Sequence, residues 1–201
     1  MRVRETARRW LIPVVACALL LAGARPALAQ GQGQKFAGII GGATLSDLSN
    51  YYNDTDSRWG GTAGLFVGGN YGRSAPVFEV SWVQKGGGDL HIDYIEPSLT
   101  FGGVVPLGQT GSARMRFYGG VSWAFKISCS EEANVIGVDD VCDIANGDEW
   151  GLPAGLQLAK VSGDKFFGLD VRYNFALSDA IENTDIMNRT WYFRVFFGKA
   201  R

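Results

Sequence analysis

The chain has 201 residues, a formal net charge of −1, three cysteines and a single histidine. This charge balance gives no indication of a nucleic-acid partner, because such proteins concentrate Lys and Arg on one face. After the amino-terminal segment, no apolar run is long enough to cross a bilayer as a helix, and the length is sufficient for one domain.

The amino-terminal segment has the layout of a secretory signal. Four arginines among the first nine residues precede an apolar run, Trp10–Ala22, and Ala27-Leu28-Ala29 supplies a small-x-small cleavage site. We therefore expect a signal peptide over residues 1–29. Two alternatives stay open: a retained anchor, for which the run is short and interrupted by proline, and a lipoprotein acylated at Cys17. Removal of the segment takes away five Arg and one Glu, which leaves a net charge of −5 on residues 30–201.

Residues 30–201 form one predicted all-β domain, because short alternating runs are separated by turn-rich pieces and helical periodicity is missing. Each run is near the length of about 9 to 11 residues that a tilted membrane strand needs. In chain order, the eight predicted strands are 35–46, 58–69, 76–86, 90–105, 113–128, 149–160, 165–177 and 189–199.

The connections between these strands alternate in kind. The long ones, rich in Asn, Asp and Ser, are 47–57, 129–148 and 178–188, with the short 87–89 on the same side. The tight turns are 70–75, 106–112 and 161–164. Short turns at one end and longer loops at the other are typical of an outer-membrane barrel with both termini in the periplasm. The long loops are then expected to face out of the cell.

Side chains alternate most regularly in the fifth predicted strand. The apolar row is Met115, Phe117, Gly119, Val121, Trp123, Phe125 and Ile127. The polar row is Arg114, Arg116, Tyr118, Gly120, Ser122, Ala124 and Lys126. The fourth, seventh and eighth strands also keep their charges on one face. Since a charge on the lipid face costs about 2–4 kcal/mol near the bilayer centre, the apolar face is predicted to meet lipid. Glycines leave the faces of the first two strands unassigned.

These patterns predict an eight-stranded antiparallel up-and-down transmembrane β-barrel with a filled polar interior. Such a barrel is just wide enough for side chains to fill it, so we expect salt bridges that hold the barrel together; a narrow ion path is the alternative. The predicted interior polar network consists of Glu79, Glu96, Arg116, Lys126, Asp170, Arg172 and Arg194.

Two cysteines remain after removal of the predicted signal peptide, Cys129 and Cys142. In an oxidising compartment, two nearby cysteines most often pair, so we expect a disulfide that closes a loop. A metal pair and free thiols are the alternatives, and no histidine or third cysteine nearby supports metal binding.

His91 is the one histidine, and it supports a hydrolase hypothesis only if a serine lies within hydrogen-bond reach. Ser128 and Ser130 are the nearest candidates, but no catalytic motif surrounds His91. We therefore expect a solvent-facing histidine and no catalytic residue, cofactor or metal site.

The acidic stretch 131–149 is expected to be a solvated loop, with cation bridging as the weaker alternative. The aromatic residues expected to form membrane-interface girdles are Trp59, Trp82, Trp123, Trp150, Tyr173 and Trp191.

Several motifs resemble the bacterial outer-membrane β-barrel domain family known as PorT-like. They are Gly41-Gly42-Ala43-Thr44-Leu45-Ser46-Asp47-Leu48, Phe78-Glu79-Val80-Ser81-Trp82-Val83-Gln84-Lys85-Gly86, Tyr94-Ile95-Glu96-Pro97-Ser98-Leu99 and Leu169-Asp170-Val171-Arg172-Tyr173-Asn174. The resemblance spans residues 30–201 and implies an outer-membrane barrel without an assigned reaction.

The expected function is a structural or surface-interaction role in a Gram-negative-type outer membrane, exerted through the external loops, with no catalysis. The expected partners are outer-membrane lipid, the barrel assembly machinery during biogenesis and an unidentified ligand at the loops; the barrel is expected to be a monomer and to bind no nucleic acid. A small pore or secretion accessory is the alternative, and a lipid A-modifying enzyme using His91 is less favoured. A soluble lipid carrier would need polar residues outside, contrary to the charge pattern.

Overall fold

The computed structural model describes residues 34–49, 56–70, 74–88, 90–108, 112–131, 142, 145–180 and 186–201. The predicted signal peptide, residues 1–29, lies outside these residues. Within them, no helix combines the length and the apolar character needed to cross a bilayer.

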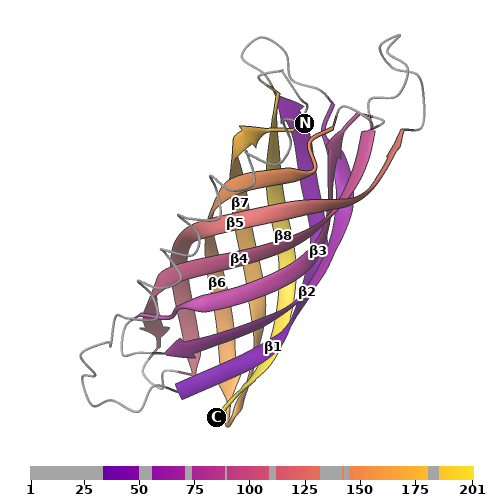
Figure 1. Cartoon of the computed structure of the whole chain (residues 1–201). Helices are drawn as coiled ribbons and strands as arrows, with labels where there is room; N and C mark the ends of the chain where they lie inside the picture. Colours follow the sequence, from indigo (N-terminus) through magenta and orange to yellow (C-terminus); the bar gives the residue numbers. More distant parts are fainter. Residues whose placement is uncertain are drawn as a thin grey trace. The chain divides into compact units, whose positions relative to one another are not determined.

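Eight strands form one antiparallel sheet that closes on itself in chain order, with β1 paired to β8 (Figure 1). Closure leaves no sheet edge with unpaired backbone groups. The predicted eight-stranded up-and-down barrel is therefore confirmed. The strands are β1 (Gln34–Ser49), β2 (Arg58–Asn70), β3 (Val77–Gly87), β4 (Leu90–Leu107), β5 (Ala113–Glu131), β6 (Asp148–Ser162), β7 (Lys165–Asp179) and β8 (Met187–Ala200).

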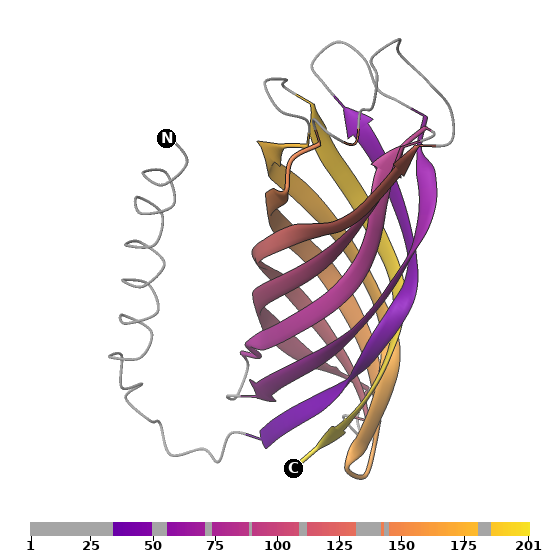
Figure 2. The same ribbon diagram turned by 45° about the vertical axis from the view of Figure 1, so that its right-hand side comes forward.

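The two ends of the barrel differ, as the connections predict. At the terminal end lie the start of β1, the carboxyl terminus and the turns that join β2 to β3, β4 to β5 and β6 to β7 (Figure 2). At the loop end, β1, β3, β5 and β7 end and β2, β4, β6 and β8 begin. Residues 50–55, 89, 132–141, 143–144 and 181–185 lie outside the described residues.

One boundary differs from the prediction by enough to matter. β5 continues to Glu131, because its last residues stay paired to the start of β4, with Ser130 opposite His91 and Glu131 opposite Leu90. Cys129 therefore lies in a strand rather than in the connection that follows it.

The outward face of the barrel is apolar and exposed. Alternate residues along β8 illustrate the pattern, since Trp191 and Val195 are exposed while Tyr192 and Arg194 between them are buried. Soluble monomers rarely expose a continuous apolar surface of this extent. The exposed apolar residues include Ile39, Trp59, Leu65, Val67, Phe78, Phe101, Phe117, Val121, Ile127, Leu152, Phe167, Leu169, Phe175, Leu177, Phe193 and Phe197.

Tryptophans on this outward face lie toward the loop end. Trp59, Trp150 and Trp191 each fall within the first few residues of a strand that begins at that end. The Trp150 ring stacks on Trp123, with centroids 4.8 Å apart, and Tyr173 contacts Trp191 at 4.7 Å. This arrangement fits the interface girdle that the sequence predicts.

The barrel interior is polar in the middle and apolar at both ends. The loop-end cluster is Leu48, Leu90, Ile92, Tyr94, Ala124, Ala145 and Ala180. The terminal-end aromatic cluster is Phe36, Phe66, Phe166 and Phe196, whose rings contact one another with centroids about 6 Å apart. The alternation along β8 predicts an inward Phe196, whereas the glycine-rich β1 and β2 give no such signal for Phe36 and Phe66.

Inward glycines allow neighbouring strands to approach closely. Gly119 and Gly120 in β5 show that this depends on the face a glycine occupies, since only one of the two points inward. A Cβ at Gly120 would lie against the Leu99 carbonyl oxygen and 2.8 Å from the Thr100 Cα. A Cβ at Gly119 would point outward, 3.8 Å from the nearest atom, the Pro153 carbonyl oxygen. Only Gly120 is therefore sterically required.

We predict that Gly120→Ala lowers the free energy of unfolding by about 1–3 kcal/mol, because the added methyl group overpacks the wall against backbone. Gly119→Ala is the matched control and should leave stability unchanged or slightly raised, since alanine loses less entropy than glycine in a strand. Urea titration of each variant folded into lipid vesicles measures the difference. Equal midpoints for the two variants would contradict the steric argument.

Candidate functional site

Four charged side chains meet in the middle of the barrel interior, and we call them the lower ionic cluster: Glu79, Asp170, Arg172 and Arg194. Glu79 accepts from two guanidinium groups, Arg172 Nη2 at 2.7 Å and Arg194 Nη1 at 2.6 Å. Arg194 Nη2 also lies 2.6 Å from Asp170 Oδ2. All four residues are buried. Two positive and two negative charges therefore neutralise one another out of contact with bulk water.

Hydroxyl groups complete the lower ionic cluster. The Tyr118 hydroxyl donates to Asp170 Oδ1 at 2.7 Å and accepts from Arg172 Nε at 3.1 Å. Ser81 Oγ donates to Glu79 Oε1 at 2.8 Å. These bonds matter because a buried polar atom without a partner costs about 1–3 kcal/mol. The cluster thus joins β3, β5, β7 and β8 across the lumen.

A second group, the upper ionic cluster, lies nearer the loop end and consists of Lys85, Glu96 and Glu149. Lys85 Nζ is 2.7 Å from Glu96 Oε2 and 3.4 Å from Glu149 Oε2. All three residues are buried. One ammonium group therefore faces two carboxylates.

Neutral donors surround these two carboxylates. Tyr94 OH donates to Glu149 Oε1 at 2.7 Å, and Asn188 Nδ2 donates to the same oxygen at 3.3 Å. Tyr192 OH donates to Glu96 at 3.1 Å, and Asn174 Nδ2 donates to it at 3.4 Å. Hydrogen bonds to a charged group favour the charged form and offset part of its desolvation. The upper ionic cluster thus compensates its second negative charge with side-chain dipoles rather than with a second cation.

Two of the seven residues predicted for one network lie outside both clusters. Arg116 lies nearer the terminal end, where its guanidinium donates to the Ala75 carbonyl oxygen, to Thr100 and to Gln157. Lys126 lies at the loop end, where its Nζ donates to the backbone oxygens of Cys142 and Ala145. The other five predicted residues belong to the two ionic clusters, whereas Arg116 and Lys126 each reach a carbonyl group close to their own level in the barrel.

Sequence reasoning missed two charged members of the upper ionic cluster. Lys85 shares the face of Glu79 in β3, since the two are an even number of residues apart, and this signal could have found it. Glu149 was grouped with the acidic stretch 131–149, although the structure places it as the second residue of β6 and buries it. The tyrosine donors Tyr94 and Tyr192 alternate with apolar residues, so the sequence pattern places them on the polar face but gives them no partner.

His91 lies on the outward face of β4 near the loop end. Its Nε2 is 2.7 Å from Gln84 Nε2 and 3.5 Å from Asp93 Oδ1. Because Gln84 Oε1 accepts from the Gly61 amide, the Gln84 NH₂ group faces the ring and His91 Nε2 is its acceptor. The register places Ser130 opposite His91, but Gln84 occupies the ring nitrogen that a hydrolase would aim at its serine.

Cys129 and Cys142 are joined by a disulfide, and both sulfur-bearing residues pack on the loop-end cluster. The bridge connects the end of β5 to the segment before β6. Residues 132–141, which hold most of the acidic stretch, lie outside the described residues. Among the residues that are described, no group of three or more His, Cys, Asp or Glu side chains is arranged to hold a metal ion.

Asp164 and Lys199 form an ion pair at the terminal end, with Nζ and Oδ2 3.0 Å apart and both side chains more than half exposed. The hydrogen bond from Lys199 lowers the pKa of the Asp164 carboxyl group. Exposed pairs of this kind contribute little to stability. The pair serves below as a control for the buried clusters.

Comparison with known proteins identifies the fold but not a family. No protein-family model and no functionally curated protein matches the sequence. Among solved structures, the outer membrane protein OprG from Pseudomonas aeruginosa is similar with a TM-score of 0.51 and 16% identity, over 84% of this chain and 96% of OprG. Neisserial surface protein A is similar with a TM-score of 0.50 and 9% identity, over 84% of this chain and 99% of that protein. The chain thus has the fold of the small eight-stranded outer-membrane barrels.

We predict that Arg194→Met lowers the free energy of unfolding by about 3–5 kcal/mol, because it leaves buried carboxylates short of a partner. Lys199→Met, on the outward face of the same strand, removes an exposed ion pair and should cause no measurable change. Urea titration in lipid vesicles compares the two variants with the parent chain. Equal stability of Arg194→Met and the parent would show that the lower ionic cluster contributes nothing to stability.

Proposed function

We propose that this chain is a non-catalytic integral protein of the outer membrane that acts through its loop end. The observation that carries the proposal is the continuous exposed apolar face around a closed barrel whose interior holds two buried ionic clusters. A large continuous apolar face is typical of a surface that contacts membrane hydrocarbon or another protein, and an apolar face around the whole barrel favours hydrocarbon. The secretory signal predicted over residues 1–29 and the fold shared with outer-membrane barrels support the same location.

The interior supports a structural role rather than conduction. From the loop end inward, the lumen holds the apolar loop-end cluster, the upper ionic cluster and the lower ionic cluster, all made of buried side chains. At the level of these three layers, an eight-stranded barrel is just wide enough for such side chains to fill it. An ion would have to break several charge-assisted hydrogen bonds to pass.

Recognition is then assigned to the loop end, since rigid scaffolds usually carry binding residues on loops. The disulfide between Cys129 and Cys142 ties the longest connection to the barrel wall there. In this proposal the chain is a monomer whose partners are outer-membrane lipid, the assembly machinery and an unidentified ligand at the loops. The resemblance to PorT-like barrels, together with the charged interior, supports the alternative of a small pore or secretion accessory.

We predict that the purified protein in a planar bilayer gives no steady single-channel openings, because three layers of side chains fill the lumen. A porin prepared in the same detergent provides the positive control for insertion. Reproducible, ohmic openings of one size would contradict the proposal and would favour the small-pore alternative.

We predict that the membrane-extracted protein shifts its gel mobility between unheated and boiled samples, as closed barrels resist unfolding in detergent. Protease added to intact cells should cut within residues 131–148 and leave the barrel core protected. A soluble periplasmic protein without a mobility shift would overturn the membrane location, and protection of 131–148 would place the loop end on the inner side.

A further inference from the structure

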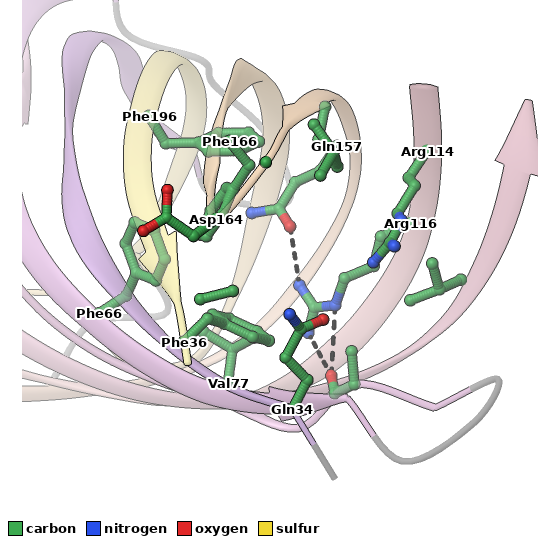
Figure 3. A pocket seen from close by; sticks show the side chains of 16 residues that line it. Gln34, Phe36, Phe66, Val77, Arg114, Arg116, Gln157, Asp164, Phe166 and Phe196 are labelled. Carbon is green, nitrogen blue, oxygen red and sulfur yellow. Dashed lines mark hydrogen bonds between the residues drawn. The ribbon is translucent and has the colours of Figure 1, made fainter. Parts of the chain in front are cut away.

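A cavity of about 160 Å³ lies inside the terminal end of the barrel (Figure 3). One wall is the terminal-end aromatic cluster, extended by Val77 and Ala159. The opposite wall carries Arg114, Arg116 and Gln157, as Figure 3 shows. The lining reaches exposed residues at the barrel edge, Gln34 and Asp164, so the cavity opens to solvent at this end.

The two arginines of this cavity differ from those of the lower ionic cluster. Arg116 is 7% exposed, yet its partners are neutral: the Ala75 carbonyl oxygen, Thr100 and the side-chain oxygen of Gln157. Arg114 lies two residues earlier on the same face of β5. Among the described residues, neither guanidinium forms an ion pair with a carboxylate. A buried cation without a counter-ion is costly, so an anion at this point would be stabilised.

The acidic residue of the cavity does not provide that counter-ion. Asp164 is paired with Lys199, whose Nζ lies 3.0 Å away. The cavity therefore combines a positive wall with an aromatic wall and has no uncompensated negative charge among the described residues.

We propose that this cavity binds a small carboxylate with an apolar body of about six carbons. Arg114 would hold the carboxylate, because a guanidinium fork matches its two oxygens. Arg116 would add its positive charge and the one Nη1 hydrogen that Gln157 does not take, since its Nε and Nη2 already donate to Ala75 and Thr100. The body would lie against the aromatic cluster, since an apolar cavity of about 150 Å³ accommodates a molecule of benzene size. The inference is independent of the proposed location and loop function.

Calorimetric titration of the whole barrel in nonionic micelles tests the proposal with hexanoate as the probe. Hexanoate should bind saturably, and both 1-hexanol, which lacks the charge, and acetate, which lacks the chain, should bind at least tenfold more weakly. Absence of saturable hexanoate binding, or equal binding of 1-hexanol, would overturn the proposal.

Two pairs of variants locate the site. Arg114→Gln should weaken hexanoate binding about tenfold, which corresponds to about 1.4 kcal/mol, whereas Arg189→Gln, on the outward face near the loop end, should leave binding unchanged. Ala159→Phe fills the cavity and should abolish binding, whereas Ala154→Phe, on the exposed face of the same strand, should not. Gel mobility of unheated samples verifies folding of each variant.

Wild-type affinity in a folded Ala159→Phe variant, or in Arg114→Gln, would place hexanoate elsewhere and overturn the proposal. Binding by a chain that begins at residue 33, but not by one that begins at Gln30, would assign the cavity to the chain's own amino-terminal residues. That result would overturn the proposal as well.

Discussion

The structure depends on one constraint: charges excluded from the outward face must find partners within a lumen too narrow for bulk water. Glu79 illustrates how tightly this is met, because it accepts from Arg172 and Arg194 together, on two strands from the opposite part of the chain. A slip of one residue in any strand exchanges the inward and outward faces. It would place charges on the apolar outward face and aromatic rings in the polar layer of the interior. Charge pairing therefore enforces the register of the whole sheet.

The two ionic clusters satisfy this constraint by different means. The lower cluster balances two guanidinium groups against two carboxylates, whereas the upper cluster holds two carboxylates with Lys85 and with tyrosine and asparagine donors. A buried pair often contributes less net stability than apolar packing, although its disruption is expensive. The clusters are better understood as selecting one register among several than as the main source of folding free energy.

The sequence predicts which side chains enter the lumen far better than which of them meet. Strict alternation identified Glu96, Asp170, Arg172 and Arg194 as inward. The number and spacing of the alternating runs predicted eight strands in one closed sheet. Partner choice depends on the stagger of strands across the lumen, as in the contact between Glu79 and Arg172, 93 residues apart. Alternation carries no information about that stagger. Lys126 shows the consequence, since it has the predicted face but bonds to backbone oxygens at the loop end.

The apolar ends of the interior escaped prediction for a related reason. Phe36 and Phe66 lie among glycines, so neither strand shows an alternation that would distinguish their faces. Glu149 was missed because it follows a dense run of acidic residues. Nothing in the sequence distinguishes this one buried carboxylate from the solvated carboxylates beside it. In both cases the prediction of buried residues fails because the neighbouring residues are of one kind, glycine in β1 and β2 and acidic residues before β6.

Arg116 marks the boundary at which the terminal-end cavity meets the lower ionic cluster. Its guanidinium lies 4.5 Å from the centroid of the Tyr118 ring, and the Tyr118 hydroxyl donates to Asp170. Only Tyr118 would therefore separate an anion bound to Arg116 from the lower ionic cluster, whose charges join β3, β7 and β8. Because the clusters close the lumen above this point, a molecule that enters the cavity must leave by the same end. The cavity is thus suited to binding at the terminal end of the barrel, while the loop end remains separate at the other end.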